Sequence, residues 1–569
     1  MQADHVGRID HPVNRSTDRR RRALAAALVL ATVGVACVSD PSGRPAVEEQ
    51  AAPGDDAWAA EVCDTVPKLW LQRMLNAYRS DWSGEVQYLP EYPNPVDGGL
   101  SHAGPWDHLQ EVPLLLYGPG YIKPGVYERP AHLTDIAPTS ASLVKFDYEA
   151  PDGRVLSQAL VPADERGLPK LLVTLVWDSA GMDVLNEWPD DWPYLRSLME
   201  RGAWFPKTTV DISNSNTPPG HAAIGTGSYP ITNGYIDEYV KFGGDLEHPS
   251  EPRLLLWPTF GDLYDISNGN RPIVGSIATL AAHSMMMSHG SLWNGGDRDI
   301  SVMRQEVDAR TGGAEAVEWN LPGQMRLYYR FPAYANTASS IEGFARRLDQ
   351  QDGQLDGLWR DNSIEQLRSG FDTPARTPYQ TQLIRAVVER EGFGDDDVPD
   401  LLYLNYKAID GVGHAFGLDS VEMQDTIRAQ DQALEELVTF LNDQVGAENW
   451  VLTLTADHGA QIPADVSGGI PIDPNRMRNL VTATFDDDGD DIELFMQIRP
   501  TQLWVDDGEL QDNGVTLDQI AEFISGLTAS QVARTDFTIP SGRENELVYQ
   551  TAFPSRIFSQ LPCFPPDQE

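Results

Sequence analysis

The chain has 569 residues and carries 42 lysines and arginines against 85 aspartates and glutamates, a formal net charge of −43 at pH 7. So acidic a protein repels the phosphates of duplex nucleic acid, and the charge indicates a highly solvated, salt-adapted surface. The length suits one large α/β domain with insertions or roughly three to four smaller domains. The acidic run FDDDGDDIE at 485–493 lacks the spacing of a calcium loop and is interpreted as a surface turn.

The first 37 residues have the features of an export signal. DRRRR at 18–22 is basic, and ALAAALVLATVGVA at 23–36 is apolar but too short to span a bilayer comfortably. Cys37 follows small residues, so the segment resembles a bacterial lipoprotein signal with Cys37 as the lipidated residue, and plain secretion is the alternative. Residues 38–60 are expected to form a disordered tether. The mature protein is therefore expected in the periplasm or on the cell surface, with this lipid as its contact with the membrane.

Two cysteines remain once Cys37 is set aside. They are Cys63 and Cys563, one near each end of the mature chain. In an oxidising compartment such a pair is a candidate disulfide.

The segment GGLSHAGPWDHLQEVPLLLYGPG at 98–120 carries two histidines, His102 and His108, six residues apart. They follow a glycine-rich turn and precede the apolar run VPLLLYG, which predicts a buried strand. This order is typical of a metal-binding loop at the edge of a sheet. The neighbouring sequence offers it no obvious partner ligands.

Three later apolar runs each end in an acidic residue, which predicts strands covered on both faces, as in a parallel sheet between helices. Ligands of open α/β sheets bind beyond the carboxyl ends of the strands, so these residues should converge. Mixed imidazole and carboxylate ligands suit zinc-like ions. A helix with an Asp419/Glu422 capping box is expected at 419–446. The runs are PKLLVTLVWDSAG (169–181, Asp178), PDLLYLNYKAIDGVGHAFG (399–417, Asp410 and His414) and NWVLTLTADHGAQ (449–461, Asp457 and His458).

A fourth segment, at 211–240, contains a polar turn that leads through Thr217 into PPGH and the small-residue stretch AAIGTG. Pro218 suits the first position of a helix. Thr217 is thus expected at a helix N-terminus, where backbone N–H groups and the helix dipole favour an anion. A simple N-cap role for Thr217 is the alternative.

Together these motifs resemble the alkaline phosphatase superfamily, and most of all its type I phosphodiesterase/nucleotide pyrophosphatase branch and the bacterial alkaline phosphatases with a threonine nucleophile. The resemblance spans about 170–465. A sulfatase would need Cys or Ser in C/S-x-P-x-R, which TPPGH does not provide. The matching residues are Asp178, Thr217 in NTPPGHAAIGTGSYP, Asp410 and His414 in IDGVGHAFGLDS, and Asp457 and His458 in TADHG.

The resemblance implies an α/β fold, with a mixed, mostly parallel sheet sandwiched by helices and a cap insertion at about 280–375. It also implies two divalent metal ions, zinc by ligand type, and Thr217 as the nucleophile. Asp178, Thr217, Asp457 and His458 would hold one ion, whereas Asp410, His414 and a later histidine would hold the other. Yet no histidine follows His458 in this chain. Two ligands alone would make a poor zinc site.

Residues 83–143 contain a histidine, His102, and resemble the C-terminal part of other family members. In this chain the segment comes before the Asp178 strand; its sequence is SGEVQYLPEYPNPVDGGLSHAGPWDHLQEVPLLLYGPGYIKPGVYERPAHLTDIAPTSASL. We therefore predict a circular permutation, with residues 61–165 as the displaced part and 166–569 as the main part of the catalytic domain. His102 then completes the site of Asp410 and His414, and His108 lies outside it. The Cys63–Cys563 disulfide would restore the severed connection.

The predicted function is metal-dependent hydrolysis of a small phosphoester, of the phosphodiesterase type. Threonine-type alkaline phosphatases carry Lys-x-Arg where this chain has Ala278 and Leu280, and those basic groups clamp a monoester. Where the family has an Asn at the phosphoryl group, Asp237 or Glu238 stands here, and Asn233 replaces a usual His. These departures favour a diester. An alkaline phosphomonoesterase with an altered clamp and a non-catalytic, metal-stabilised surface lipoprotein are the alternatives.

Overall fold

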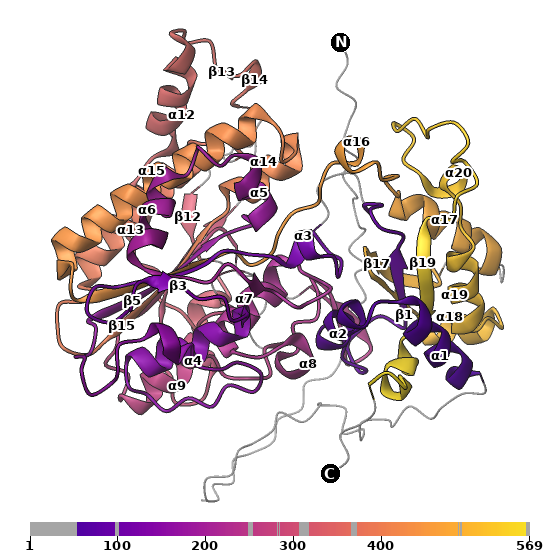
Figure 1. Cartoon of the computed structure of the whole chain (residues 1–569), viewed down its shortest axis with the longest axis horizontal. Coiled ribbons are helices and arrows are strands. Elements are labelled where there is room, and N and C mark those ends of the chain that lie inside the picture. Colours follow the sequence, from indigo (N-terminus) through magenta and orange to yellow (C-terminus); the bar gives the residue numbers. More distant parts are fainter. Residues whose placement is uncertain are drawn as a thin grey trace, which may run out of the picture. The chain divides into compact units, whose positions relative to one another are not determined.

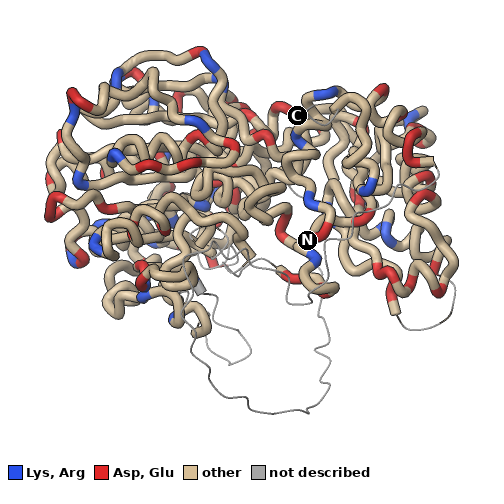
Figure 2. The backbone as a smooth tube through the Cα atoms, turned by 90° about the horizontal axis from the view of Figure 1, so that it is seen from below, with Lys and Arg blue, Asp and Glu red and all other residues tan. Residues whose placement is uncertain are grey.

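The computed structural model describes residues 54–96, 102–248, 254–280, 283, 285–305, 318–321, 323–365, 372–486, 489 and 492–564. The export signal, Cys37, most of the predicted tether at 38–60 and part of the acidic run at 485–493 lie outside these residues. Among the described helices, none is both long enough and apolar enough to cross a membrane. Figure 2 shows the positions of acidic residues spread along most of the described backbone, as the composition leads one to expect.

A nine-stranded mixed sheet in the order β12-β11-β10-β15-β5-β16-β2-β6-β3 carries the three predicted apolar runs at its centre (Figure 1). These are β5 (Leu171–Trp177), β15 (Asp400–Tyr406) and β16 (Trp450–Thr455), which run parallel to one another. Every residue of the three strands is buried, so both faces are covered, as predicted. The other strands are β2 (Leu114–Tyr117), β3 (Gly125–Val126), β6 (Ala203–Trp204), β10 (Val274–Ile277), β11 (Ile300–Gln305) and β12 (Glu318–Asn320).

Helices cover both faces of this sheet (Figure 1). The helix expected at 419–446 is α15, which begins at Val421 because the Ser420 hydroxyl caps it by accepting from the Met423 N–H. The predicted Asp419/Glu422 capping box is therefore wrong. One layer contains α5 (Met182–Glu187), α6 (Pro193–Arg201), α13 (Arg376–Glu391), α14 (Ala408–Phe416) and α15 (Val421–Leu441); the other contains α4 (Ile136–Leu143), α7 (Thr217–Thr226), α8 (Pro230–Asn233) and α9 (Phe260–Ser267).

A second, four-stranded antiparallel sheet has the order β17-β18-β1-β19 and packs against its own apolar core. Its strand β1 (Val86–Pro90) comes from the N-terminal part of the chain and pairs with both β18 (Gln502–Val505) and β19 (Tyr549–Pro554). Residues 61–165 thus supply β1 to this sheet and β2 to the nine-stranded sheet. The remaining elements of this region are β17 (Phe495–Arg499), α17 (Pro474–Phe485), α18 (Asp507–Asp512), α19 (Leu517–Ser525) and α20 (Ala529–Val532).

The two ends of the described chain are joined covalently. Helix α1 (Asp55–Thr65) carries Cys63, which forms a disulfide with Cys563, 500 residues away. Around the bond, α1 and α2 (Lys68–Asn76) pack on the C-terminal segment in one apolar cluster. The predicted pairing of these cysteines is confirmed in the structure.

The cap insertion predicted at about 280–375 contributes β11 and β12 to the edge of the nine-stranded sheet, so it is partly continuous with the catalytic sheet. Its other elements are α11 (Ala335–Ala338), α12 (Ile341–Asp349), β13 (Leu358–Trp359) and β14 (Asn362–Ser363). Short elements elsewhere are α3 (Asp107–Gln110), β4 (Ala131–His132), β7 (Thr208–Thr209), β8 (Val240–Phe242), β9 (Asp245–Glu247) and α16 (Ala464–Ser467).

Candidate metal centre

The polar residues predicted at the three strand ends meet at the carboxyl edge of the central sheet. Asp178 directly follows β5, Asp410 lies in the first turn of α14 after β15, and Asp457 and His458 follow β16. Parallel neighbouring strands place such residues side by side. Asp178, Asp457 and His458 are fully buried, and Asp410 is 5% exposed. Buried carboxylates in such a cluster need cations or metal ions as partners.

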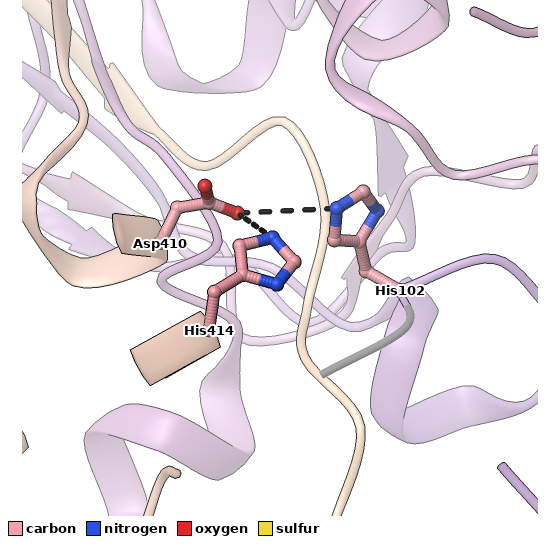
Figure 3. Close-up of side chains that lie close together, drawn as sticks. All are labelled: His102, Asp410 and His414. Carbon is pink, nitrogen blue, oxygen red and sulfur yellow. Dashed lines mark ion pairs between the residues drawn. The ribbon is translucent and has the colours of Figure 1, made fainter. Parts of the chain in front are cut away.

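His102 joins Asp410 and His414 in one group (Figure 3). His102 Nε2 lies 3.9 Å and His414 Nε2 lies 3.4 Å from the same carboxylate oxygen, Asp410 Oδ1. One ligand atom from each residue lies within 4.8 Å of the other two. His102 comes from the loop between β1 and β2, so the structure brings the N-terminal histidine to these two residues, as predicted.

A second group surrounds His458. Its Nε2 lies 3.4 Å from Asp457 Oδ2, 3.8 Å from Asp178 Oδ1 and 3.4 Å from Thr217 Oγ1. The His102 ring stacks on the His458 ring at 3.9 Å between centroids. The two predicted ligand groups are therefore adjacent, with Thr217 beside one of them.

The hydrogen bonds of the imidazoles leave ligand lone pairs directed into both groups. His102 Nδ1 lies 3.2 Å from the Ser215 carbonyl oxygen, and His458 Nδ1 lies 2.8 Å from that of Gly459. A carbonyl only accepts, so each Nδ1 carries the proton and each Nε2 keeps its lone pair. Among the described side chains, Asp410 Oδ1 and Asp457 Oδ2 are buried oxygens without a hydrogen-bond partner. This donor set fits two divalent ions with mixed imidazole and carboxylate ligands.

Thr217 lies at the N-terminus of α7, as predicted, but it is the first helical residue itself, so Pro218 stands at the second position and not at the first. The side chain of the N-cap residue, Asn216, does not cap the helix but donates to Asp237 Oδ1 at 2.8 Å. The first N–H groups of α7 therefore have no side-chain cap, and with the helix dipole they favour an anion beside the Thr217 hydroxyl. Thr217 is 6% exposed.

Four further residues, not singled out from the sequence, contact this centre. Lys407 Nζ lies 2.7 Å from Asp178 Oδ1 and from Asp410 Oδ2, and 3.2 Å from Thr217 Oγ1. His283 Nε2 lies 3.3 Å from Asp178 Oδ2, and Asn405 donates to the same oxygen. His221, in α7, lies 2.9 Å from the Thr217 carbonyl oxygen through Nδ1, and the same nitrogen lies 3.4 Å from Asp457 Oδ2. Asn405 and Lys407 could have been identified from their position, because they lie at the same end of β15 that leads to Asp410.

Burial and neighbouring charges set the ionisation of the centre. Burial opposes the charge of Asp410, but Lys407 and His414 outweigh it and hold the pKa of that carboxyl well below its usual range. Burial and Asp457 raise the pKa of Asp178, against the effect of Lys407. Burial, together with His458, lowers the pKa of His102 well below its usual value. His102 is thus neutral, as a metal ligand must be.

Ala278 and Leu280 stand where threonine-type alkaline phosphatases would carry the basic clamp Lys-x-Arg. Ala278 is buried at the end of β10, and Leu280 is 52% exposed. Between them, Thr279 Oγ1 accepts a hydrogen bond from Arg376 Nη2 at 2.6 Å. Arg376 belongs to α13 and is 3% exposed, so a guanidinium from a different element reaches the region of the absent clamp.

The residues that replace the family's Asn and His have structural partners. Asp237 is fully buried and accepts from Gln502 Nε2 at 2.9 Å and from Arg499 Nε at 3.3 Å. Glu238 pairs with Arg499 Nη2 at 2.7 Å. Asn233 is buried and donates to the Ser228 carbonyl at 2.7 Å. Arg499 thus offsets the two carboxylates that the sequence placed near the phosphoryl group.

His108 lies outside both ligand groups, as predicted. Its Nε2 lies 3.4 Å from Gln461 Oε1, and its ring stacks on Trp106 at 5.9 Å between centroids. It is 8% exposed, and its ring lies 5.9 Å from that of Tyr92. The two histidines of this loop therefore have different surroundings.

Comparisons with known proteins show which proteins this chain is similar to. Alkaline phosphatase PhoV of Synechococcus elongatus is 22% identical over 343 residues, which cover 53% of this chain and 61% of PhoV. Alkaline phosphatase PafA of Elizabethkingia meningoseptica is 36% identical over 88 residues, 16% of each chain. A crystal structure of wild-type alkaline phosphatase PafA is 19% identical, covers 68% of this chain and 82% of its own, and has a TM-score of 0.47.

The chain therefore spans about three-fifths of the length of PhoV. A model of the family "Type I phosphodiesterase / nucleotide pyrophosphatase" matches residues 172–548, more than half of the chain. This match includes Asp178, Thr217 and the strand ends of β15 and β16. The chain belongs to the type I phosphodiesterase/nucleotide pyrophosphatase family.

Proposed function

We propose that this protein is a metal-dependent phosphoester hydrolase with Thr217 as its nucleophile and a two-metal site. The observation that carries the proposal is the convergence of Thr217 with six buried or half-buried ligand residues at one sheet edge. Asp410 Oδ1 and Asp457 Oδ2 are buried there without hydrogen-bond partners. His102, Asp410 and His414 form one group. Asp178, Asp457 and His458 are the other three, linked by the approach of His458 Nε2 to Asp457 Oδ2 and Asp178 Oδ1.

Two divalent ions at these groups would supply Lewis-acid stabilisation of the attacking and leaving oxygens. Zinc is the ion that the imidazole and carboxylate donors favour. Thr217 would belong to the group of Asp178, Asp457 and His458, because its Oγ1 lies 3.4 Å from His458 Nε2. Asn405 and His283 would orient Asp178, since both approach its Oδ2.

The protein's own groups favour attack by Thr217 on phosphorus. Lys407 donates to Thr217 Oγ1 at 3.2 Å, which stabilises developing negative charge on that oxygen. The uncapped N-terminus of α7 directs N–H groups at an anion bound in front of Thr217. Attack forms the Thr217 Oγ1–phosphorus bond and breaks the bond from phosphorus to the leaving oxygen, and the proton of the Thr217 hydroxyl ends on the departing alcohol. Water then cleaves the phosphothreonine, which restores the Thr217 hydroxyl and releases a phosphate monoester from a diester.

A diester is the substrate class that these positions favour. Ala278 and Leu280 supply no charge for the second anionic oxygen of a monoester. The alternative, an alkaline phosphomonoesterase, is supported by the similarity to proteins named alkaline phosphatases. Arg376 beside Thr279 would then replace part of the clamp.

The test compares bis-p-nitrophenyl phosphate with p-nitrophenyl phosphate in the presence of added zinc. Wild type, Thr217→Ala and the control Thr232→Ala, on the neighbouring helix α8, are assayed side by side. We expect turnover of the diester above that of the monoester, loss of at least about 1000-fold in Thr217→Ala and none in Thr232→Ala. Turnover that does not depend on Thr217 would favour a metal-stabilised binding protein instead.

We also propose that the protein is exported and anchored at Cys37. The signal pattern of residues 1–37 supports this, as does the Cys63–Cys563 disulfide, because such bonds persist in oxidising compartments. Cys37→Ser should move the protein from the membrane fraction to the soluble fraction of the cell envelope. Equal membrane association of both forms would contradict lipid anchoring.

A further inference from the structure

Three aspartates form a further group that shares no residue with the metal centre. Asp265 lies in the last turn of α9, and Asp297 and Asp299 belong to the loop that leads into β11. One carboxylate oxygen from each lies within 4.8 Å of the other two. Asp265 is 3% exposed and Asp299 is 7% exposed, whereas Asp297 faces solvent. Carboxylates buried this close together are costly unless a cation accompanies them.

Asp265 has no protein partner that would explain its burial. Its Oδ1 is a buried oxygen without a hydrogen-bond partner among the described residues. The charged groups that act on it are again carboxylates, Asp297 and Asp262. The last turn of α9 contains no basic residue, and the negative end of the helix dipole disfavours a carboxylate there and favours a cation. The burial of this acceptor at this end of the helix therefore points to a cation as its partner.

The basic side chains near the group act at its exposed side. Arg298 and Arg330 both act on Asp297. Arg298 is itself exposed, so solvent and salt screen its charge. Arg330 Nη2 pairs with Glu391 Oε2 at 2.7 Å. These two guanidinium groups therefore do not take the place of a cation between the two buried carboxylates.

The ligand atoms of this group suit a hard cation. All three are carboxylate oxygens, and calcium takes roughly six to eight oxygen ligands, water among them, at about 2.3–2.6 Å. Two oxygens on one such ion lie at most about 5 Å apart, and the spacing of this group meets that limit. Zinc would favour imidazole or thiolate, which the group lacks, and magnesium demands a tighter octahedron. Asp297, at the exposed side, lets water complete the ligand shell.

Helix α9 contacts both ends of the loop at 289–299. Asp262 accepts the His289 N–H at 2.9 Å where the loop begins. Asp265, three residues further along the same helix, meets Asp297 and Asp299 where the loop ends. An ion at the second contact would thus complete the attachment that the hydrogen bond makes at the first.

We propose that Asp265, Asp297 and Asp299 bind one calcium ion, which fixes the loop before β11 to the end of α9. This site is separate from the proposed hydrolytic centre and does not depend on it. The ion would stabilise the edge of the nine-stranded sheet, because β11 lies beside β10 there.

The experiment measures calcium binding to the zinc-loaded protein by calorimetric titration with calcium chloride in about 0.15 M potassium chloride. Zinc saturates the catalytic groups, and the salt screens diffuse binding to the acidic surface. Asp265→Asn and Asp299→Asn each remove one charge at nearly unchanged volume. The control Asp245→Asn makes the same change at an exposed aspartate of β9. His102→Ala is the second control, in the hydrolytic centre.

We expect wild type to bind about one calcium ion per chain with a Kd of about 10⁻⁴ M or tighter. Saturating calcium should raise its unfolding midpoint by about 2 °C or more. Asp265→Asn and Asp299→Asn should bind calcium about tenfold or more weakly and lose this rise. Asp245→Asn and His102→Ala should bind calcium as wild type does. Unfolding midpoints in calcium-free buffer confirm that each variant folds.

Three results would overturn the site. Wild type would show no saturable binding up to about 10 mM calcium, beyond the range of weak extracellular sites. Alternatively, Asp265→Asn and Asp299→Asn would keep the affinity of wild type, as diffuse surface binding requires. Finally, His102→Ala would lose calcium, which would assign the ion to the hydrolytic centre. Failure of the proposed hydrolysis would appear in the turnover assay and would leave this titration unchanged.

Discussion

The side chains of Asn405 and Asp178 are joined by a hydrogen bond of 2.8 Å, in which the Asn405 amide donates to Asp178 Oδ2. The same amide nitrogen lies 3.1 Å from His221 Nε2. His221 in turn lies 2.9 Å from the Thr217 carbonyl through Nδ1. One residue of β15 thus connects a ligand carboxylate to the helix that carries the proposed nucleophile.

Asn405→Ala should weaken zinc binding by about 10-fold to 100-fold, because residues that orient metal ligands typically contribute that much affinity. Competition with a chromophoric chelator measures the affinity directly. Asn268→Ala, at the end of α9, is the control and should leave the affinity unchanged. Wild-type affinity in Asn405→Ala would show that Asp178 is held by its other contacts.

His102→Ala should reduce the zinc content from two ions to about one per chain, because Asp410 and His414 alone make a poor site. Metal analysis after dialysis gives the stoichiometry. His108→Ala removes the other histidine of the same loop and should retain both ions. Equal metal content in the two variants would contradict the assignment of His102.

The Cys63–Cys563 bond should stabilise the protein by about 2–5 kcal/mol, since it restricts the unfolded chain over a separation of 500 residues. Urea unfolding of the double variant Cys63→Ser/Cys563→Ser, with zinc present throughout, checks this value. Wild type in reductant should unfold at the same urea concentration as the double variant. An unchanged midpoint in both would exclude a stabilising role.

His132 and Asp211 form an ion pair at 2.7 Å, remote from the ligand groups. Burial opposes protonation of His132, but Asp211 outweighs it and raises the pKa of the imidazole. Burial likewise opposes the charge of Asp211, yet His132 lowers the pKa of that carboxyl. The pair therefore stabilises the fold between the unfolded pKa of Asp, about 4, and that of His, about 6.5.

This stabilisation is lost as pH rises through the raised pKa of His132, and again as pH falls through the lowered pKa of Asp211. His132→Asn should cost about 1 kcal/mol at pH 6 and close to nothing at pH 9, because the imidazole is partly exposed and screened. Urea unfolding at both pH values gives the difference. A cost independent of pH would assign the effect to packing.

The proposed permutation is tested by reversing it. A chain in which residues 166–569 precede residues 61–165, joined through a short flexible linker, should fold with the Cys63–Cys563 bond and with the zinc content of wild type. Strand β1 supports this expectation, because it already pairs with β18 and β19 from the other end of the chain. A soluble, folded product without zinc would show that the present order is needed to build the site.

The fold could be predicted where the sequence contains continuous runs of apolar residues. The fully buried strands β5, β15 and β16 are continuous apolar runs, and the Asp and His residues behind them are fixed in place by the strand ends. The group of His102, Asp410 and His414 was predictable for another reason: no histidine follows His458, and residues 83–143 resemble the C-terminal part of the family. No local pattern links His102 to α14, so spacing alone would not have found it.

Lys407, His283 and Asn405 were missed for a different reason. Asn405 and Lys407 belong to an otherwise apolar strand end, where a polar residue is as consistent with a helix cap as with a ligand contact. His283 sits in the Met-rich segment HSMMMSHG, whose composition is typical of apolar packing, yet its Nε2 approaches Asp178. Which polar groups share one cavity depends on long-range packing, and the one-dimensional pattern does not contain it.

Strand β2 has a consequence for the order in which the chain is made. It is the first strand of the nine-stranded sheet to be synthesised, and its neighbours are β6 and β16. Its fully buried LLLY run therefore lacks its partner β16 while more than 300 later residues are made. Such long-range pairing slows folding and exposes an aggregation-prone segment. The edge of β2 that pairs with β16 stays open until the last quarter of the chain is being made.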